Sequence, residues 1–418
     1  MEEILKRVIL ENQELISGRK LVNRNVIIPA TESINVITGI RRCGKTYMLY
    51  ELAQRYEKEQ ILFLDFEDER LVALNTLNNY DVITDSFKIL YPHLKPVLFF
   101  DEIQNLKNWY LYLKRLHVQG YKIFVTGSNA HLISREIATY IKGHSMETTI
   151  CPFSFREFLK LKNIELRYKD VIINQPKILN LFDEYLLYGG FPEVIKAEPA
   201  DKRAVAKNIY NLLFYKDLVA KFGKDEYLLK LVVNKIAENI TKDFSVTSLA
   251  RKIISVYKTS VPTVADYFNI LPEPFLTTNI YLYRDSFVQR ESKRKTYFTD
   301  NSFIWLNRVS PDKSRLFENL VFNYLQQDHA EIYFYKTGNN REVDFFTGQS
   351  DEKLLIQSCY SFENSDTRKR EINSLLRAME EQALNTGLIF TNNHSEEIKA
   401  KDRTIKVIRL WEYALGDL

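Results

Sequence analysis

The chain of 418 residues has the composition of an ordinary globular protein, with 45% hydrophobic and 27% charged residues. Its formal net charge is only +4, which by itself does not indicate a nucleic-acid partner. Three cysteines, Cys43, Cys151 and Cys359, show no CxxC spacing, which argues against disulfides and zinc and predicts a reducing, cytoplasmic environment. No apolar run approaches the ~20 residues of a membrane span, so we expect no membrane partner. At ~150 residues per domain, the length predicts about three domains.

The first predicted element is an amphipathic helix near the start of the chain. Apolar residues recur at helical spacing from Ile4 to Ile16, and the pattern stops before Gly18. We expect this helix to cap the first domain, which we place at residues 1–152.

A glycine-bounded loop comes next, between a predicted strand and a predicted helix. Residues 34–38, INVIT, form an apolar run typical of a buried strand, and residues 47–53, YMLYELA, have helical spacing. Between them, residues 39–46 read GIRRCGKT, which is the Walker A pattern in the strand, loop and helix context that it requires. A chance match on a basic loop is the alternative, and both flanking elements argue against it.

The residue types of this loop are those that bind a nucleoside triphosphate. Its glycines let successive backbone N–H groups point at a phosphate, and the following helix N-terminus adds partial positive charge. Lys45 is expected to reach the β- and γ-phosphates of ATP, while the Thr46 hydroxyl ligates Mg²⁺. Arg41 and Arg42 are not explained by the phosphate cradle, and they either pair with acids of a lid or face a partner. The candidate nucleotide-binding residues are Gly39, Arg41, Arg42, Gly44, Lys45, Thr46 and Tyr47.

Two further apolar runs predict strands, and the second ends in a pair of acids. The first covers residues 60–66, QILFLDF, and the second covers residues 96–102, PVLFFDE. An apolar strand that ends in Asp-Glu downstream of a P-loop is the Walker B pattern. Asp101 is expected to hold Mg²⁺, directly or through water, and Glu102 to polarise the water that attacks the γ-phosphate. Two surface acids at a strand end are the alternative.

A fourth predicted strand, at residues 122–127, ends in a polar turn. In a P-loop sheet, ligands lie beyond the carboxyl ends of the parallel strands, so Ser128 or Asn129 is a candidate sensor that hydrogen-bonds the attacking water or the γ-phosphate. Turn chemistry also explains the sequence Gly-Ser-Asn, and both interpretations stay open. The extra strand between the two Walker strands, together with Glu102, favours the ATPase branch of P-loop proteins over the small GTPases.

These motifs carry a family resemblance, together with residues 98–104, LFFDEIQ, and residues 151–158, CPFSFREF. The sequence resembles the prokaryotic AAA-type ATPase family that has a C-terminal DUF4143 domain, and the resemblance covers essentially the whole chain. It implies an ATP-binding protein. The Walker elements are its specific part, whereas the second half of the chain matches by pattern.

The middle of the chain, residues 153–240, is predicted to be a helical, amphipathic lid. Its one sharp turn is at residues 189–192, GGFP. The family has a similar turn, and we interpret it as a structural joint in preference to a chemical site.

A winged-helix domain is predicted at residues 241–310. Two capped segments, 244–253 and 260–268, form a helix-turn-helix pattern with the second as recognition helix, and residues 281–283 and 295–298 would supply the wing. Residues 245–298 carry eight lysines and arginines against four acids, a moderate footprint for DNA phosphates. A winged helix that contacts only protein is the alternative, because the recognition helix carries Asp266 and no basic residue.

Residues 311–418 resemble the restriction-endonuclease-like fold in the order of their predicted elements. That fold needs an acid on one strand and Glu-x-Lys on the next, so that carboxylates hold Mg²⁺ and the lysine positions water. Glu318 and Asp344 fit, but Gln357 and Cys359 stand where the glutamate and the lysine should be. We therefore predict a nuclease-derived, inactive domain, in which a relocated Lys353 or Lys336 is the alternative that would restore activity.

The predicted fold class is α/β, with a P-loop NTPase parallel sheet and helical lid followed by a winged-helix and a restriction-endonuclease-like domain. The leading hypothesis is an ATP-hydrolysing molecular switch with Glu102, Lys45, Ser128 and Asn129 as catalytic candidates, Thr46 and Asp101 as metal ligands, and ATP and Mg²⁺ as cofactors. A DNA-binding regulator that uses ATP only as a conformational ligand and an active metal-dependent nuclease are the alternatives. DNA, a protein partner and a second copy of the chain remain open as partners.

Overall fold

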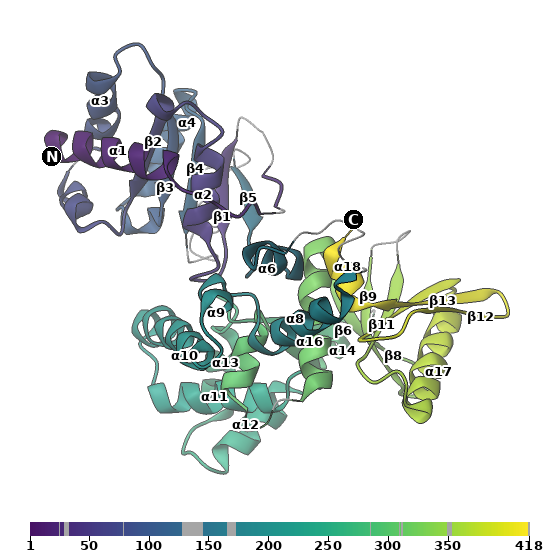
Figure 1. The fold of residues 1–418 in the computed structure, drawn as a ribbon. Helices are drawn as coiled ribbons and strands as arrows, with labels where there is room; N and C mark the ends of the chain where they lie inside the picture. Colours follow the sequence, from purple (N-terminus) through teal and green to yellow (C-terminus); the bar gives the residue numbers. More distant parts are fainter. Residues whose placement is uncertain are drawn as a thin grey trace. The chain divides into compact units, whose positions relative to one another are not determined.

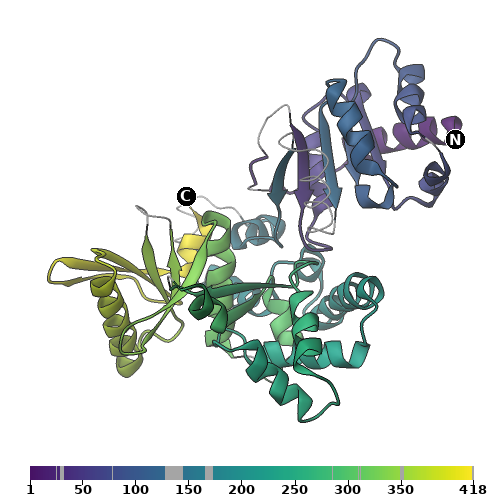
Figure 2. The same ribbon diagram turned by 180° about the vertical axis from the view of Figure 1, so that it is seen from behind.

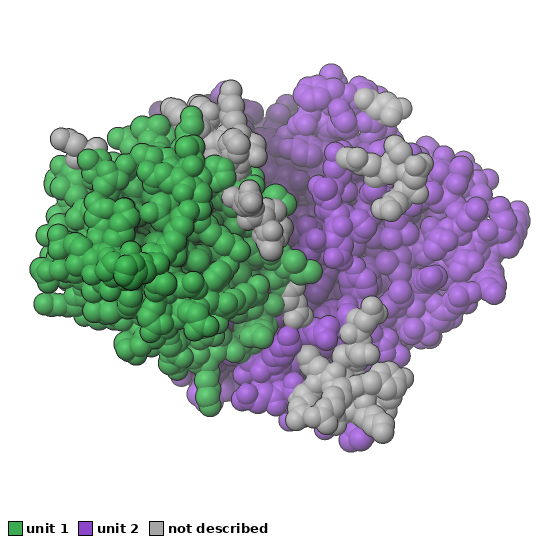
Figure 3. All heavy atoms as spheres, turned by 90° about the horizontal axis from the view of Figure 1, so that it is seen from above, with its two compact units in different colours: residues 1–151 green, residues 152–418 purple. Residues whose placement is uncertain are grey.

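The computed structural model describes most of the chain and divides into two compact units, Met1–Cys151 and Pro152–Leu418 (Figure 3). We call them unit 1 and unit 2 and describe each by itself. The described residues are 1–24, 26–28, 33–77, 79–127, 145–164, 173–284, 286–308, 310, 312–348 and 353–416.

A parallel five-stranded sheet forms the centre of the described part of unit 1, in the order β2-β3-β4-β1-β5 (Figure 1). Its strands are β1 (Ile34–Thr38), β2 (Ile61–Asp65), β3 (Val97–Asp101), β4 (Ile123–Gly127) and β5 (Ser145–Thr149). The four strands predicted from apolar runs are confirmed, and β5 is additional. Since β4 lies between β1 and β3, the two Walker strands are not neighbours.

Helices cover both faces of this sheet, which explains why β1 to β4 read as continuous apolar runs. The helix predicted near the start of the chain is confirmed as α1, and Gln13 ties it to β2 because its Nε2 donates to the Ile61 carbonyl at 2.9 Å. The helices and 3-10 turns are α1 (Glu2–Ser17), α2 (Lys45–Ala53), η1 (Lys58–Gln60), η2 (Glu69–Thr76), α3 (Asp81–Leu90), η3 (Ile103–Asn105) and α4 (Trp109–Val118).

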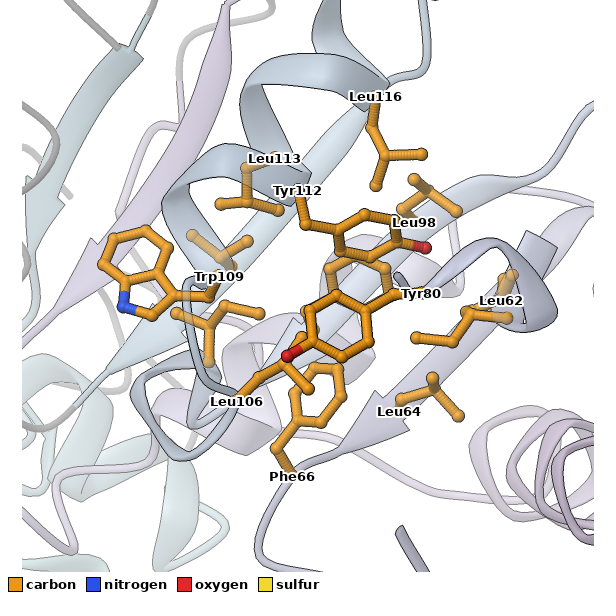
Figure 4. Close-up of a cluster of buried hydrophobic side chains, with 14 of the residues drawn as sticks. Leu62, Leu64, Phe66, Tyr80, Leu98, Leu106, Trp109, Tyr112, Leu113 and Leu116 are labelled. Atoms are coloured by element: carbon orange, nitrogen blue, oxygen red, sulfur yellow. The ribbon is translucent and has the colours of Figure 1, made fainter. Parts of the chain in front are cut away.

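Alternate residues of the strands face two separate layers of side chains. On one face, Leu62 and Leu98 pack with Tyr112 and Leu116 of α4 in a cluster of buried side chains (Figure 4). On the other face, Phe99 and Phe124 stack with their ring centroids 5.1 Å apart. Burial on both faces fixes the register of the strands and hence the positions of the residues at their ends.

Unit 2 begins with a run of helices, as predicted for residues 153–240. Two short helices, α12 and α13, follow at the position of the predicted helix-turn-helix pattern. The side chain of Ser245 caps α12, and that of Ser260 caps α13. The described helices up to this pair are α6 (Phe155–Leu161), α8 (Gln175–Tyr188), α9 (Pro192–Lys196), α10 (Lys202–Leu212), the π-helix η4 (Leu213–Ala220), α11 (Glu226–Glu238), α12 (Val246–Ile254) and α13 (Val261–Asn269).

A mixed sheet occupies the rest of unit 2, with eight strands among the described residues, in the order β12-β13-β11-β10-β9-β8-β6-β7 (Figures 1 and 2). Its strands are β6 (Thr277–Leu282), β7 (Arg294–Phe298), β8 (Ile332–Lys336), β9 (Glu342–Thr347), β10 (Leu354–Cys359), β11 (Thr386–Thr391), β12 (Glu396–Ala400) and β13 (Arg403–Arg409). The accompanying helices are α14 (Phe287–Ser292), α15 (Asn301–Leu306), α16 (Lys313–Asp328), α17 (Ser365–Glu381) and α18 (Leu410–Leu415).

The two strands expected to form a wing belong to this larger sheet. β6 and β7 do pair with each other, but β6 also pairs with β8 in parallel, with Tyr281 opposite Tyr333. A free strand edge gains hydrogen bonds by such pairing, and nothing in the local sequence shows which distant strand provides it. The sheet thus runs across position 310, while the domain boundaries at 152, 240 and 310 stay predictions.

The turn at residues 189–192 is held by a buried carboxylate. Gly189 has φ +77°, and a Cβ atom there would lie 1.9 Å from Oδ1 of Asp300. Asp300 accepts the N–H of Gly190 at 2.7 Å and that of Ser302 at 2.9 Å. These contacts support the interpretation of the turn as a structural joint.

Stability should depend on pH through Asp300. Burial raises the pKa of its carboxyl to about 6, and the hydrogen bonds from Gly190 and Ser302 offset this only in part. The pKa of Asp300 is higher in the folded protein than in the unfolded chain, so the protonated carboxyl stabilises the folded state. This contribution is complete below pH ~4 and is lost as pH rises through 6. From pH 5 to pH 7 this group should lower the free energy of unfolding by on the order of 1 kcal/mol.

Urea unfolding of the wild type and Asp300→Asn at both pH values measures this contribution. We expect the variant to show a smaller loss of stability between pH 5 and pH 7 than the wild type. Equal losses in the two proteins would contradict the assignment of this pH dependence to Asp300.

Candidate nucleotide-binding site

The loop at residues 39–46 has the backbone that a phosphate cradle requires. Gly39 has φ +145°, and a Cβ atom there would lie 2.2 Å from the Ile150 carbonyl oxygen, so the position excludes any larger residue. Gly44 is the N-cap of α2, which places the N-terminus of a helix directly after the loop. A helix N-terminus favours an anion.

Lys45 is folded back on its own loop. Its side chain is only 4% exposed, and Nζ donates to the carbonyl oxygens of Gly39 at 3.1 Å and Ile40 at 3.3 Å. Nζ also lies 3.9 Å from Oε1 of Glu102. The cation that Walker A supplies is therefore held beside the second acid of Walker B.

Hydroxyl groups join the two Walker segments at Asp101. The Thr46 hydroxyl donates to Oδ2 of Asp101 at 2.6 Å, and the Thr126 hydroxyl donates to Oδ1. Burial raises the pKa of Asp101 to about 6, and the hydrogen bonds from the two hydroxyl groups offset only part of this increase. Hydroxyl and carboxylate oxygens are the ligands that Mg²⁺ prefers, so Thr46 and Asp101 fit the metal expected here.

Glu102 is held in a strained conformation by three contacts. Its φ is +48°, a region that non-glycine residues rarely adopt. The backbone N–H donates to the Thr126 hydroxyl oxygen at 3.0 Å, and Oε2 accepts Nε2 of Gln104 at 2.5 Å. Together with Lys45, these groups fix the position of the carboxylate, as a catalytic base requires.

Thr126 and Gln104 are functional candidates to which the motifs assign no role. Thr126 is a polar residue at the end of the apolar run 123–125, and this is the signal that could have identified it. Gln104 lies in the 3-10 turn η3 and ends the stretch 98–104 that carries the family resemblance, which is the signal that could have identified it.

Arg24 is a further residue at the loop that sequence patterns do not reveal. Its guanidinium donates to the carbonyl oxygens of Cys43 at 3.0 Å and Cys151 at 2.8 Å. Arg24 thereby connects the loop to the end of unit 1, and its backbone N–H binds Glu51 of α2 at 3.0 Å.

The remaining predicted nucleotide-binding residues lie on the loop and on the first turn of α2. Arg41 lies 3.4 Å from Glu67, an acid of unit 1 rather than of the predicted lid, and Arg42 has φ +69°. Tyr47 is 52% exposed and has the Arg19 guanidinium 5.2 Å from its ring centroid. Ser128 and Asn129 lie outside the described residues, so their sensor role stays a prediction.

Three family models match successive segments of the chain. Residues 31–159 match an AAA domain, residues 179–331 match a domain of unknown function (DUF8612), and residues 313–413 match a domain of unknown function (DUF4143). Among the described residues, no helix combines the length and apolar character needed to cross a membrane.

Two relatives match over most of their length. An uncharacterized protein of Methanocaldococcus jannaschii, MJ1544, is 32% identical over 438 residues, covering 99% of this chain and 95% of the relative. An uncharacterized protein of Haemophilus influenzae is 27% identical over 364 residues, covering 84% and 88%. A solved Walker-type ATPase of Pyrococcus abyssi shows a looser likeness, with 16% identity, 71% and 100% coverage and a TM-score of 0.44. By its AAA domain, its DUF4143 domain and its full-length relative, the chain belongs to the AAA-type ATPase family with a C-terminal DUF4143 domain.

Proposed function

We propose that unit 1 binds and hydrolyses ATP with Mg²⁺ and that its nucleotide state controls unit 2. The convergence of the two Walker segments carries this proposal. Thr46 lies 2.6 Å from Asp101, and Lys45 lies 3.9 Å from Glu102, so four residues with complementary roles meet at the carboxyl ends of β1 and β3. The match of residues 31–159 to an AAA domain supports the same assignment.

Lys45 and Thr46 are the phosphate and metal contacts in this proposal. Lys45 would exchange its bonds to the neutral carbonyls of Gly39 and Ile40 for phosphate oxygens, because its ammonium is attracted more strongly to an anionic oxygen than to a neutral one. Thr46 and Asp101 would hold Mg²⁺, which neutralises the charge that develops on the phosphates. Gly39, Arg41, Arg42, Gly44 and Tyr47 would line the nucleotide.

Glu102 is the proposed general base that orients and deprotonates the attacking water. Thr126 fixes its backbone and Gln104 fixes its carboxylate, so the base is positioned before the nucleotide binds. Ser128 and Asn129 keep their proposed role as sensors.

Unit 2 is the proposed output, with residues 153–240 as a lid, α12 and α13 as a helix-turn-helix and residues 311–418 as a nuclease-derived domain. In α13, the recognition helix, Asp266 pairs with Lys224. Because this helix carries an acid and no basic residue, we propose that it contacts a protein in preference to DNA phosphates.

Lys45→Ala should lower ATP affinity at least ~10-fold, since a hydrogen bond to a charged group contributes about 1.5–3 kcal/mol. Fluorescence titration with an ATP analogue measures the affinity, and Lys107→Ala, an exposed lysine of the same unit, is the matched control. Unchanged affinity in Lys45→Ala would sink the assignment of the nucleotide site.

Glu102→Gln should still bind ATP but hydrolyse it about 10²–10⁴ times more slowly, because it removes the base and leaves the phosphate contacts in place. Phosphate release measures turnover, with exposed Glu59→Gln as the control. If Glu102→Gln hydrolyses ATP at the wild-type rate, Glu102 is not the base.

ATP should change hydrogen exchange within unit 2 if unit 1 controls it. We expect the change in Glu102→Gln, which retains ATP, and none in Lys45→Ala at an ATP concentration that fills the wild-type site but not the weakened one. Identical exchange in unit 2 with and without ATP, in a protein shown to bind the nucleotide, would contradict the switch while leaving the ATPase intact.

A further inference from the structure

A buried lysine lies among three carboxylates in unit 2. The side chain of Lys295 on β7 is only 1% exposed, although lysine is rarely buried. Its Nζ lies 3.0 Å from Oε1 of Glu318, 2.8 Å from Oε1 of Glu342 and 3.4 Å from Oδ1 of Asp344. We call these four residues the lysine cluster.

The cluster lies where a metal site is expected on fold-level grounds. Glu318 comes from α16 and Asp344 from β9, which are the two positions predicted for acids from the resemblance to the restriction-endonuclease-like fold. By that resemblance, a divalent cation is expected at this place.

The residues present do not fit a divalent cation. The carboxylate oxygens nearest to Nζ of Lys295 are already engaged. Oε1 of Glu318 accepts Lys295 Nζ and the Tyr297 hydroxyl at 2.9 Å. For Asp344, Oδ1 accepts Lys295 Nζ at 3.4 Å and Oδ2 accepts the Ser358 N–H at 2.9 Å. With Lys295 in place, no set of three His, Cys, Asp or Glu side chains within the described ranges is arranged to hold a metal ion.

On the neighbouring strand, the residue at the expected glutamate position already has other partners. Gln357 on β10 uses its Oε1 to accept the Asp344 N–H at 3.0 Å and its Nε2 to bind Glu371. The lysine that lies among the acids is Lys295 and not Lys336, which pairs with Asp243 at 3.0 Å and approaches Glu342 at 3.6 Å.

We propose that the ammonium group of Lys295 is a built-in cation that takes the place of the divalent metal, so that residues 311–418 fold without metal and do not cleave phosphodiester bonds. The carboxylates that would hold the metal instead hold β7 against α16 and β9. This inference is independent of ATP binding in unit 1.

The Lys295 ammonium has three carboxylates within 3.4 Å of its Nζ. An ammonium in this position repels a second cation, and removing it would leave several buried carboxylates without their shared partner.

Access is not the obstacle to a metal ion. Asp344 and Glu342 also line a cavity of about 540 Å³, together with Gln357, Glu371 and Arg370. A divalent cation can therefore approach the acids, and replacing Lys295 by a neutral residue should let it bind.

Electron paramagnetic resonance with Mn²⁺ on the full, nucleotide-free chain tests the proposal. We expect the wild type and Asp344→Asn to bind the same amount of Mn²⁺, because Asp344 holds none in the wild type. Lys295→Met should gain one Mn²⁺ site that depends on Asp344. Lys293→Met, which changes an exposed neighbouring lysine and serves as the matched control, should gain none. Adding Asp344→Asn to Lys295→Met should abolish the new site. An Asp344-dependent Mn²⁺ site in the wild type, or a folded Lys295→Met without one, would overturn the proposal.

A second measurement does not depend on whether Lys295→Met folds. Wild-type protein incubated with linear DNA and Mn²⁺ should leave the DNA intact, as it does with EDTA. Cleavage that appears with Mn²⁺ and disappears with EDTA would show a working metal site; if Asp344→Asn also removes it, the lysine cluster is that site and the proposal fails.

Discussion

A short chain of hydrogen bonds around Asp101 determines the geometry of the candidate nucleotide-binding site. Thr126 of β4 and Thr46 of α2 both donate to the Asp101 carboxylate, and the same Thr126 hydroxyl accepts the N–H of Glu102. Since β4 separates the two Walker strands, a side chain from β4 is well placed to join them. Thr126 thus sets the position of both acids relative to the loop.

The buried acids of the two units have different kinds of partner. Asp101 is held by hydroxyl groups, and burial raises its pKa to about 6, so the arrangement favours the arrival of a cation. The acids of the lysine cluster surround an ammonium that belongs to the chain itself. Buried charge needs a partner of opposite sign. Unit 1 is suited to take that partner from solution, whereas unit 2 already contains it.

Secondary structure and loop motifs could be predicted from the sequence, because each depends on a few adjacent residues. Contacts between residues far apart in the chain could not be predicted. Strands such as 34–38 and 97–101 are apolar on both faces, and the loop at 39–46 carries its own glycine and lysine pattern, so their types are readable from a few adjacent residues. Lys295 is different, because its role depends on the pairing of β6 with β8. Arg24 reaches its partners across the fold, and no local pattern records such contacts.

A crystal structure of Glu102→Gln with ATP and Mg²⁺ tests the central claim most directly. We predict that Lys45 leaves the carbonyl oxygens of Gly39 and Ile40 for the phosphates, that Thr46 and Asp101 lie at the metal, and that residue 102 faces the γ-phosphate. A structure in which the nucleotide binds elsewhere, or in which Lys45 keeps its bonds to the loop, would contradict the account.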